Sequence, residues 1–167
     1  FSMAILRLDP LVDPANDIFK APCRHKLLSL SKQGRVAGCF ASPPCATVAA
    51  ARHKRLDEKH HGPRPLRSRD AVWYCLKGRN SHEQYMVDVG SYLALFCIGY
   101  LGDVSLKGGW AGFEHPVDRK RYPFPSFFNS QEMRALMAVA GLKYHVSHQG
   151  LFGAASLKPT GLLLPCS

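Results

Sequence analysis

The sequence lacks the cysteine spacing of the common zinc sites. Its six cysteines are scattered without a CxxC pair, whereas structural zinc sites use closely spaced pairs of cysteine and histidine ligands. The histidine-rich run HKRLDEKHH at 53–61 also fits no standard ligand spacing, so we expect no metal site. Scattered cysteines without a disulfide framework favour a reducing compartment.

The sequence also lacks a long apolar run and a recognisable signal peptide. Its most apolar segment, 92–101, is about half the length of roughly 20 residues that a membrane span needs. We therefore expect an intracellular protein without a membrane span, nuclear if it acts on DNA. The opening residues 1–3 resemble the remnant of a tag or a cut end. A length of 167 residues is typical of one domain, which we place at 1–167.

Acidic residues are few. The chain has 22 lysines and arginines against 12 acids, a net charge of +10, which favours a polyanionic partner, nucleic acid first and an anionic membrane second. Much of the charge falls in a basic loop at 52–70, although a solvated loop without a partner would have the same composition. The candidate phosphate-binding residues in this loop are Arg52, Lys54, Arg55, Arg64, Arg67 and Arg69.

Apolar periodicity and turn residues predict alternating strands and helices. This order favours an α/β fold with a mostly parallel sheet, helices on both of its faces and an antiparallel pair of strands at one edge. The expected strands are 4–8, 17–19, 36–41, 110–113, 143–148 and 157–164, and the expected helices are 23–33, 81–101 and one that begins at Asn129 and ends at Gly141.

Two short motifs directly follow predicted strands. Ser42-Pro43-Pro44-Cys45 comes after the strand at 36–41, and Glu114-His115-Pro116 comes after the strand at 110–113. The carboxyl ends of parallel strands meet at one edge of a sheet, where functional residues collect. We therefore expect both motifs at the same edge, although a turn cysteine and an acid that caps a turn would need no chemistry. A second basic patch should lie on the same rim and consists of Arg119, Lys120 and Arg121.

These motifs resemble those of the cytosine-5 nucleic-acid methyltransferases. That family places Pro-Pro-Cys at the end of one strand, a helix next, and a Glu-Asn-Val or Glu-Asn-Pro sequence at the end of the following strand. Gly112-Phe113-Glu114-His115-Pro116 occupies the second place here. The combination of Pro-Pro-Cys, Gly-Pro-Arg-Pro-Leu-Arg-Ser and Glu-His-Pro also resembles methyltransferase-like segments of dinoflagellate and retroelement-associated proteins.

The resemblance implies a Rossmann-like, three-layer methyltransferase fold and a reaction. Cys45 would be the nucleophile that adds to C6 of cytosine, and Glu114 would hold the ring at N3. The methyl donor would be S-adenosylmethionine, with Asp9, Asp17 and Pro43 as candidate cofactor-binding residues. Such chemistry needs the base outside a duplex stack, and the two basic patches would bind the phosphates around it.

The sequence departs from the family in several ways. Ala46-Thr47-Val48-Ala49 stands where the family often has Gln-x-Phe-Ser, and the family's Gln-x-Arg-x-Arg strand is not present. The glycine-rich cofactor loop, Phe-x-Gly-x-Gly after a first strand, does not occur. We therefore expect a truncated domain that is inactive by itself, or one whose missing half lies on a second chain. A non-catalytic nucleic-acid-binding or assembly subunit of a larger complex, built on the same scaffold, is the main alternative. A thiol or redox enzyme at Cys45 is a weaker one.

Overall fold

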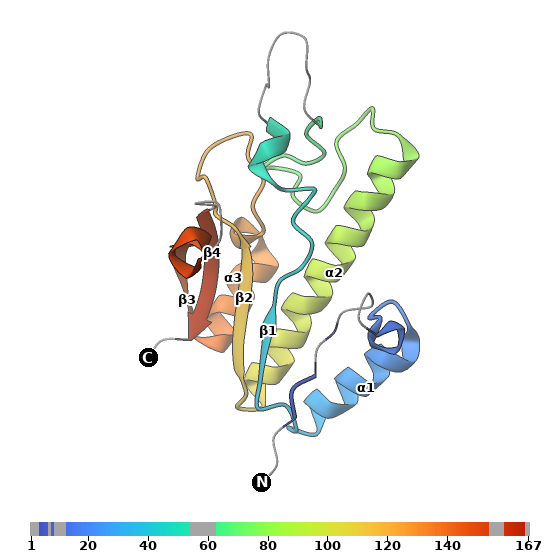
Figure 1. Ribbon diagram of the computed structural model, residues 1–167, viewed down its shortest axis with the longest axis vertical. Coiled ribbons are helices and arrows are strands. Elements are labelled where there is room, and N and C mark those ends of the chain that lie inside the picture. The colour runs from blue at the N-terminus through green and yellow to red at the C-terminus, as the bar shows by residue number, and fades with distance from the viewer. Residues whose placement is uncertain (1–3, 7, 9–12, 54–62, 154–158, 166–167) are drawn as a thin grey trace.

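The computed structural model describes residues 4–6, 8, 13–53, 63–153 and 159–165, and these contain a four-stranded sheet (Figure 1). Its strands lie in the order β1-β2-β4-β3. β1 and β2 are parallel, and β4 is antiparallel to both β2 and β3. Three strands therefore run in one direction and β4 in the other. The strands are β1 (Gly38–Ala41), β2 (Trp110–Pro116), β3 (Leu142–His148) and β4 (Pro159–Pro165).

The α/β class and the antiparallel pair at one edge are confirmed, but the sheet is mixed rather than mostly parallel. Of its three strand pairings, one is parallel and two are antiparallel. The reason is that β4 returns between β2 and β3 instead of adding to the outer edge. The prediction from alternating elements could not foresee that insertion.

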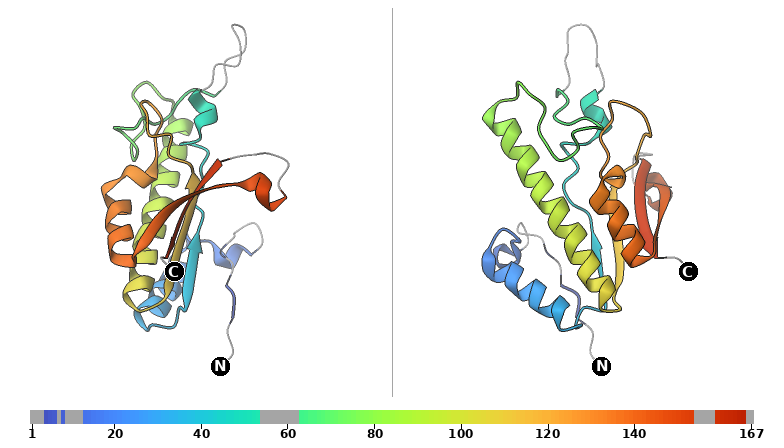
Figure 2. Two further views of the ribbon diagram at one scale, coloured as in Figure 1. Left: turned by 90° about the vertical axis from the view of Figure 1, so that its left-hand side faces the viewer. Right: turned by 180° about the vertical axis from the view of Figure 1, so that it is seen from behind.

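The three helices lie on one side of the sheet (Figure 2). They are α1 (Ala21–Lys32), α2 (Ser81–Leu106) and α3 (Gln131–Ala140). The crossovers β1-α2-β2 and β2-α3-β3 both move in the same direction along the sheet, and right-handed crossovers of that kind place their helices on one face. We expected three layers, with helices on both faces of the sheet. The described part of the chain has two, the sheet and one layer of helices. On the opposite face, the residues Phe40 and Trp110 are 49% and 51% exposed.

Local sequence signals explain where the long helices begin and end. The Asn80 side chain accepts from the Glu83 backbone N–H at 2.9 Å, and the Glu83 carboxylate accepts from the Asn80 N–H at 3.0 Å, a capping box that begins α2. α3 begins with Ser130 as its N-cap, one residue later than the predicted Asn129. It ends at Gly141, whose φ of 60° is a left-handed conformation suited to glycine.

Two clusters of buried side chains form the core. The larger one lies between the sheet and helices α2 and α3, and includes Phe113, Phe127 and Leu163, all fully buried. The smaller one joins α1 to α2 through Leu27 and Tyr100. Because burying apolar surface is the main favourable term in folding, these contacts fix the helices against the sheet.

Two predictions for the N-terminal region were wrong. Residues 4–6 and 8 form no strand, and residues 17–19 form a turn after the 3₁₀ helix η1 (Pro14–Asn16). The α2 helix also continues five residues past the expected end at 101. Within the described residues it is the one helix with the length and apolar composition to cross a membrane, a property that the core helix of a globular protein shares. A clear membrane span is therefore not seen in that part of the chain.

Candidate functional site

The two motifs lie side by side at the same edge of the sheet, as the sequence predicted. The prediction that β2 ends at 113 was wrong, because Glu114-His115-Pro116 forms its last three residues. The parallel register pairs Ala41 with Phe113, which places the next residues, Ser42 and Glu114, opposite one another. The Ser42 hydroxyl donates a hydrogen bond to the Glu114 carboxylate. This bond links residues 72 positions apart in the sequence and joins the two motifs directly.

Cys45 lies in a compact turn that the chain holds in place at several points. The backbone N–H groups of Val48 and Ala49 both donate to the Cys45 carbonyl, each at 3.0 Å. Thr47, two residues after the cysteine, is buried and accepts a hydrogen bond from Arg67. The Cys45 side chain is half-buried and packs against the larger core cluster. Hydrogen bonds of the turn and packing against the core therefore hold Cys45 in place.

Arg67 is inside the protein and does not reach the surface. Its side chain is 0% exposed, so the prediction that it binds phosphate is corrected. The guanidinium donates to the hydroxyls of Thr47 at 2.9 Å and Ser91 at 2.8 Å, and to the carbonyls of Val87 at 2.8 Å and Val72. It also lies over the Phe127 ring, 5.4 Å from the centroid. Burial lowers the pKa of Arg67 to about 10.

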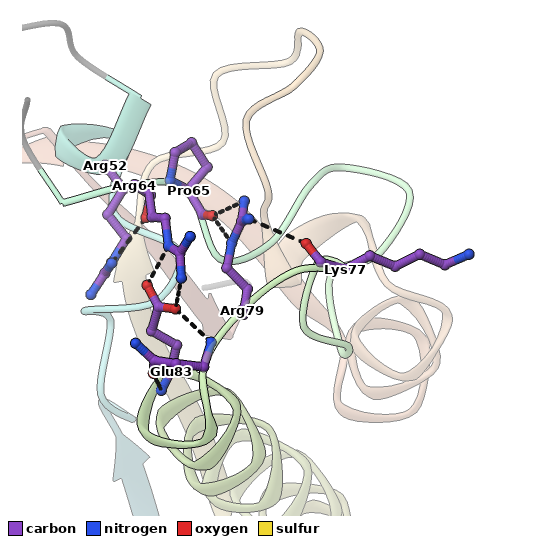
Figure 3. A network of polar contacts seen from close by, with 7 residues as sticks. Arg52, Arg64, Pro65, Lys77, Arg79 and Glu83 are labelled. Atoms are coloured by element: carbon purple, nitrogen blue, oxygen red, sulfur yellow. Dashed lines mark hydrogen bonds and ion pairs between the residues drawn. The ribbon is translucent and has the colours of Figure 1, made fainter.

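Other arginines of the basic loop also bond within the chain (Figure 3). Arg64 makes a two-pronged ion pair with Glu83 at the start of α2. Arg52 donates to the Ala46 carbonyl at 2.6 Å and to the Arg64 carbonyl at 3.0 Å. Arg69 pairs with Asp118 at 2.8 Å. These three side chains connect the Cys45 turn, α2 and the segment after β2, and Lys54 and Arg55 lie outside the described residues.

The second basic patch lies next to the first, as expected. Arg119, Lys120 and Arg121 are exposed. The Phe124 ring lies 5.2 Å from the Arg119 guanidinium carbon, 5.3 Å from that of Arg121 and 5.0 Å from the His53 ring. His53 belongs to the basic loop, so Phe124 joins the two patches.

A pocket of about 360 Å³ opens beside the carboxyl end of β1. Its lining includes Asp17 and Pro43, two of the predicted cofactor-binding residues, together with Phe19, Phe40 and Tyr100. The third, Asp9, lies outside the described residues. The size falls in the range of small-molecule sites, roughly 300–1,000 Å³, and the mostly apolar lining with one carboxylate is typical of them.

Sequence reasoning missed the residues that hold the site together. Neither Ser42 nor Thr47 is among the predicted site residues, although Ser42 bonds to Glu114 and Thr47 to Arg67. The signal for Arg67 was its position in Pro-Leu-Arg-Ser beside buried Leu66 and Ser68, but a run of arginines indicates a solvated surface more often than a core.

Comparisons add no relatives to these findings. No model of a protein family, no curated protein and no solved structure matches this chain. Within the described residues, no group of three histidines, cysteines or acids is placed to hold a metal ion.

Proposed function

We propose that this chain is a cytosine-5 nucleic-acid methyltransferase-like protein, inactive by itself for want of a glycine-rich cofactor loop. The observation that supports it most is the contact between the two motifs. A Pro-Pro-Cys turn follows β1, an acid lies near the carboxyl end of the neighbouring parallel strand β2, and Ser42 bonds directly to the Glu114 carboxylate. This arrangement brings a thiol-bearing turn and an acid to one edge of the sheet.

The proposed chemistry divides between these two residues. Cytosine C6 is a weak electrophile, so the Cys45 thiolate has to add there while Glu114 holds N3. The electron pair of the sulfur forms the new bond to C6, and the electrons of the C5–C6 double bond move to C5. That carbon then becomes nucleophilic. The base has to leave its stack to reach the thiol.

The pocket beside β1 fits part of the cofactor that this chemistry needs. S-adenosylmethionine, when bound, supplies an electrophilic methyl group. The apolar walls from Phe19, Phe40 and Tyr100 suit a flat heterocycle, and the Asp17 carboxylate at the lining suits a hydrogen-bond donor of a nucleoside. The fit covers the nucleoside part alone, because the glycine-rich loop that would hold the amino-acid part does not occur in the sequence.

A second candidate is a non-catalytic nucleic-acid-binding or assembly subunit on the same scaffold. The exposed cations 119–121 and the net charge of +10 support it without a cofactor. Calorimetry separates the two functions. Salt-sensitive binding of RNA or DNA without any S-adenosylmethionine affinity favours the subunit.

The catalytic proposal is tested by covalent trapping. Oligonucleotides that carry 5-fluorocytosine are incubated with the protein and S-adenosylmethionine, alone and with a separate chain supplying a glycine-rich cofactor loop, and adducts are mapped by mass spectrometry. With the cofactor-loop chain supplied, we expect an adduct on Cys45 that is lost in Cys45→Ala and kept in Cys75→Ala, a matched change at another half-buried cysteine. Absence of a Cys45 adduct under both conditions would remove the enzymatic function.

A further inference from the structure

The segment between β2 and α3 is held rigidly where it leaves the site. The Asp118 backbone N–H donates to the Tyr144 hydroxyl at 3.0 Å, and the Asp118 carboxylate pairs with Arg69. The Arg69 backbone N–H in turn donates to the Pro123 carbonyl at 3.1 Å. The segment is therefore fixed to two neighbouring parts of the chain before any ligand binds.

Three exposed cations gather in this segment. The guanidinium groups of Arg119 and Arg121 share the Phe124 ring. The nearby Asp118 carboxylate is already engaged by Arg69 and by the Lys120 backbone N–H at 2.8 Å. Among the described residues no carboxylate bonds to the side chain of Arg119, Lys120 or Arg121. Like charges held together in this way favour a bound anion, and the planar fork of arginine matches the geometry of backbone phosphates.

The exposed ring of Tyr122 lies in the sequence next to these cations. Tyr122 is 68% exposed, although its neighbour Phe124 is half-buried beneath two guanidinium groups. A large apolar ring left in water beside phosphate-binding cations is the arrangement on which proteins stack the bases of single strands. In a duplex, the faces of the bases are already stacked on one another and are not available to such a ring.

We propose that the segment Arg119-Lys120-Arg121-Tyr122, supported by Phe124, binds an unpaired nucleic-acid strand, with one base stacked on Tyr122 and its phosphates on the three cations. This inference rests on the proposed function for the place of the strand beside Cys45. It adds the class of substrate: single-stranded or looped nucleic acid rather than a continuous duplex. Phe124 contacts His53, and the neighbouring Arg52 donates to the Ala46 carbonyl, so the segment adjoins the Cys45 turn.

The test measures binding, not catalysis. Fluorescence anisotropy compares a labelled 12-nucleotide single strand, in DNA and RNA forms, with a blunt duplex of the same sequence at several salt concentrations. We expect at least tenfold tighter binding of the single strand. Tyr122→Ala should weaken single-strand binding about tenfold and leave duplex binding nearly unchanged, because one base stack is lost. Tyr122→Phe keeps the ring and should bind as the parent chain does.

A second exposed tyrosine serves as the matched control. Tyr85 on α2 is 66% exposed, so Tyr85→Ala removes a similar ring from a different element. Equal affinity for the single strand and the duplex overturns the inference. An unchanged single-strand affinity in Tyr122→Ala overturns it too. Preferential binding to vesicles with anionic lipid, with weak binding of either nucleic acid, overturns it as well. Melting curves confirm that each variant is folded.

The outcome is separable from that of the trapping experiment. Single-strand preference with no Cys45 adduct leaves the binding surface in place on a non-catalytic subunit. If the adduct forms faster on a duplex than on a single strand, the proposed function stands, and the inference that a single strand stacks on Tyr122 is rejected.

Discussion

At the scale of single residues, the buried cation Arg67 supports the candidate site from the core. Arg67 has no acidic partner among its hydrogen bonds, which go to two hydroxyls and two backbone carbonyls. Burying a charge is costly unless it is paired and hydrogen-bonded. Four of the five guanidinium N–H groups of Arg67 donate to neutral acceptors, and the face of Phe127 adds to that compensation. Through Thr47 the guanidinium also fixes the turn that carries Cys45.

Replacing Arg67 should therefore destabilise the fold far more than replacing a surface arginine. Arg67→Met keeps the apolar stem but leaves the buried hydroxyls of Thr47 and Ser91 without their donor, and we expect a loss of about 3 kcal/mol in the free energy of unfolding. Urea denaturation measures it. Arg35→Met changes an exposed residue and should stay within about 0.5 kcal/mol. Similar values for the two variants would show that Arg67 is not part of the core.

At the scale of elements, the start of α2 combines two stabilising roles in one carboxylate. Glu83 closes the capping box with Asn80 and pairs with Arg64 from the segment before the helix (Figure 3). The hydrogen bond from Arg64, followed by that from the Asn80 backbone, lowers the pKa of Glu83 to about 2. The charged carboxylate therefore joins the helix cap to the segment that contains Arg67.

This lowered pKa predicts a specific dependence of stability on pH. A carboxyl whose pKa is lower in the folded state stabilises the fold above its ordinary pKa of 4.5, and the contribution is lost as the pH falls toward about 2. Glu83→Gln should therefore melt at a lower temperature than the parent at pH 7, and the gap should close between pH 4.5 and 2. Melting curves across that range measure the gap. A constant gap at all pH values would indicate packing rather than charge.

Two glycines of α2 provide a matched pair for the contact with Arg67. A Cβ at Gly90 would lie 3.1 Å from the Arg67 Nη2 and 3.4 Å from the Thr47 hydroxyl, whereas one at Gly99 would meet nothing within 4 Å. Gly99→Ala should stabilise the helix by about 0.5–1 kcal/mol. In Gly90→Ala the crowding of Arg67 should cancel that gain. Urea denaturation compares them, and equal stabilisation at both positions would contradict the close approach.

At the scale of the whole molecule, local signals predicted the elements better than their arrangement. The helix patterns, the end of β1 before Ser42 and the final antiparallel strands all follow from short-range periodicity and turn residues. The two-layer architecture depends on the direction of successive crossovers, which no local pattern records. The inward turn of Arg67 depends on acceptors 20 to 24 residues away in the sequence. Long-range contacts of this kind were not available from one sequence.

The distribution of the +10 charge decides whether nucleic acid would bind at one rim or anywhere on the surface. A triple change of Arg119, Lys120 and Arg121 to alanine removes three cations at the carboxyl edge of the sheet. A control with the same net charge replaces three exposed cations that precede the amino ends of β1 and β2, namely Lys32, Arg35 and Lys107.

Binding of a single strand as a function of salt distinguishes the two sets of cations. Each phosphate neutralised contributes about 0.7 to the slope of log affinity against log salt, so the loss of three contacts should reduce the slope by about 2. The control should change the overall affinity slightly and keep the slope, because distant exposed charges act through a field that salt screens within about 10 Å. Equal slopes for the two triple variants would mean that the net charge of the molecule, rather than the rim beside Cys45 and Glu114, attracts the strand.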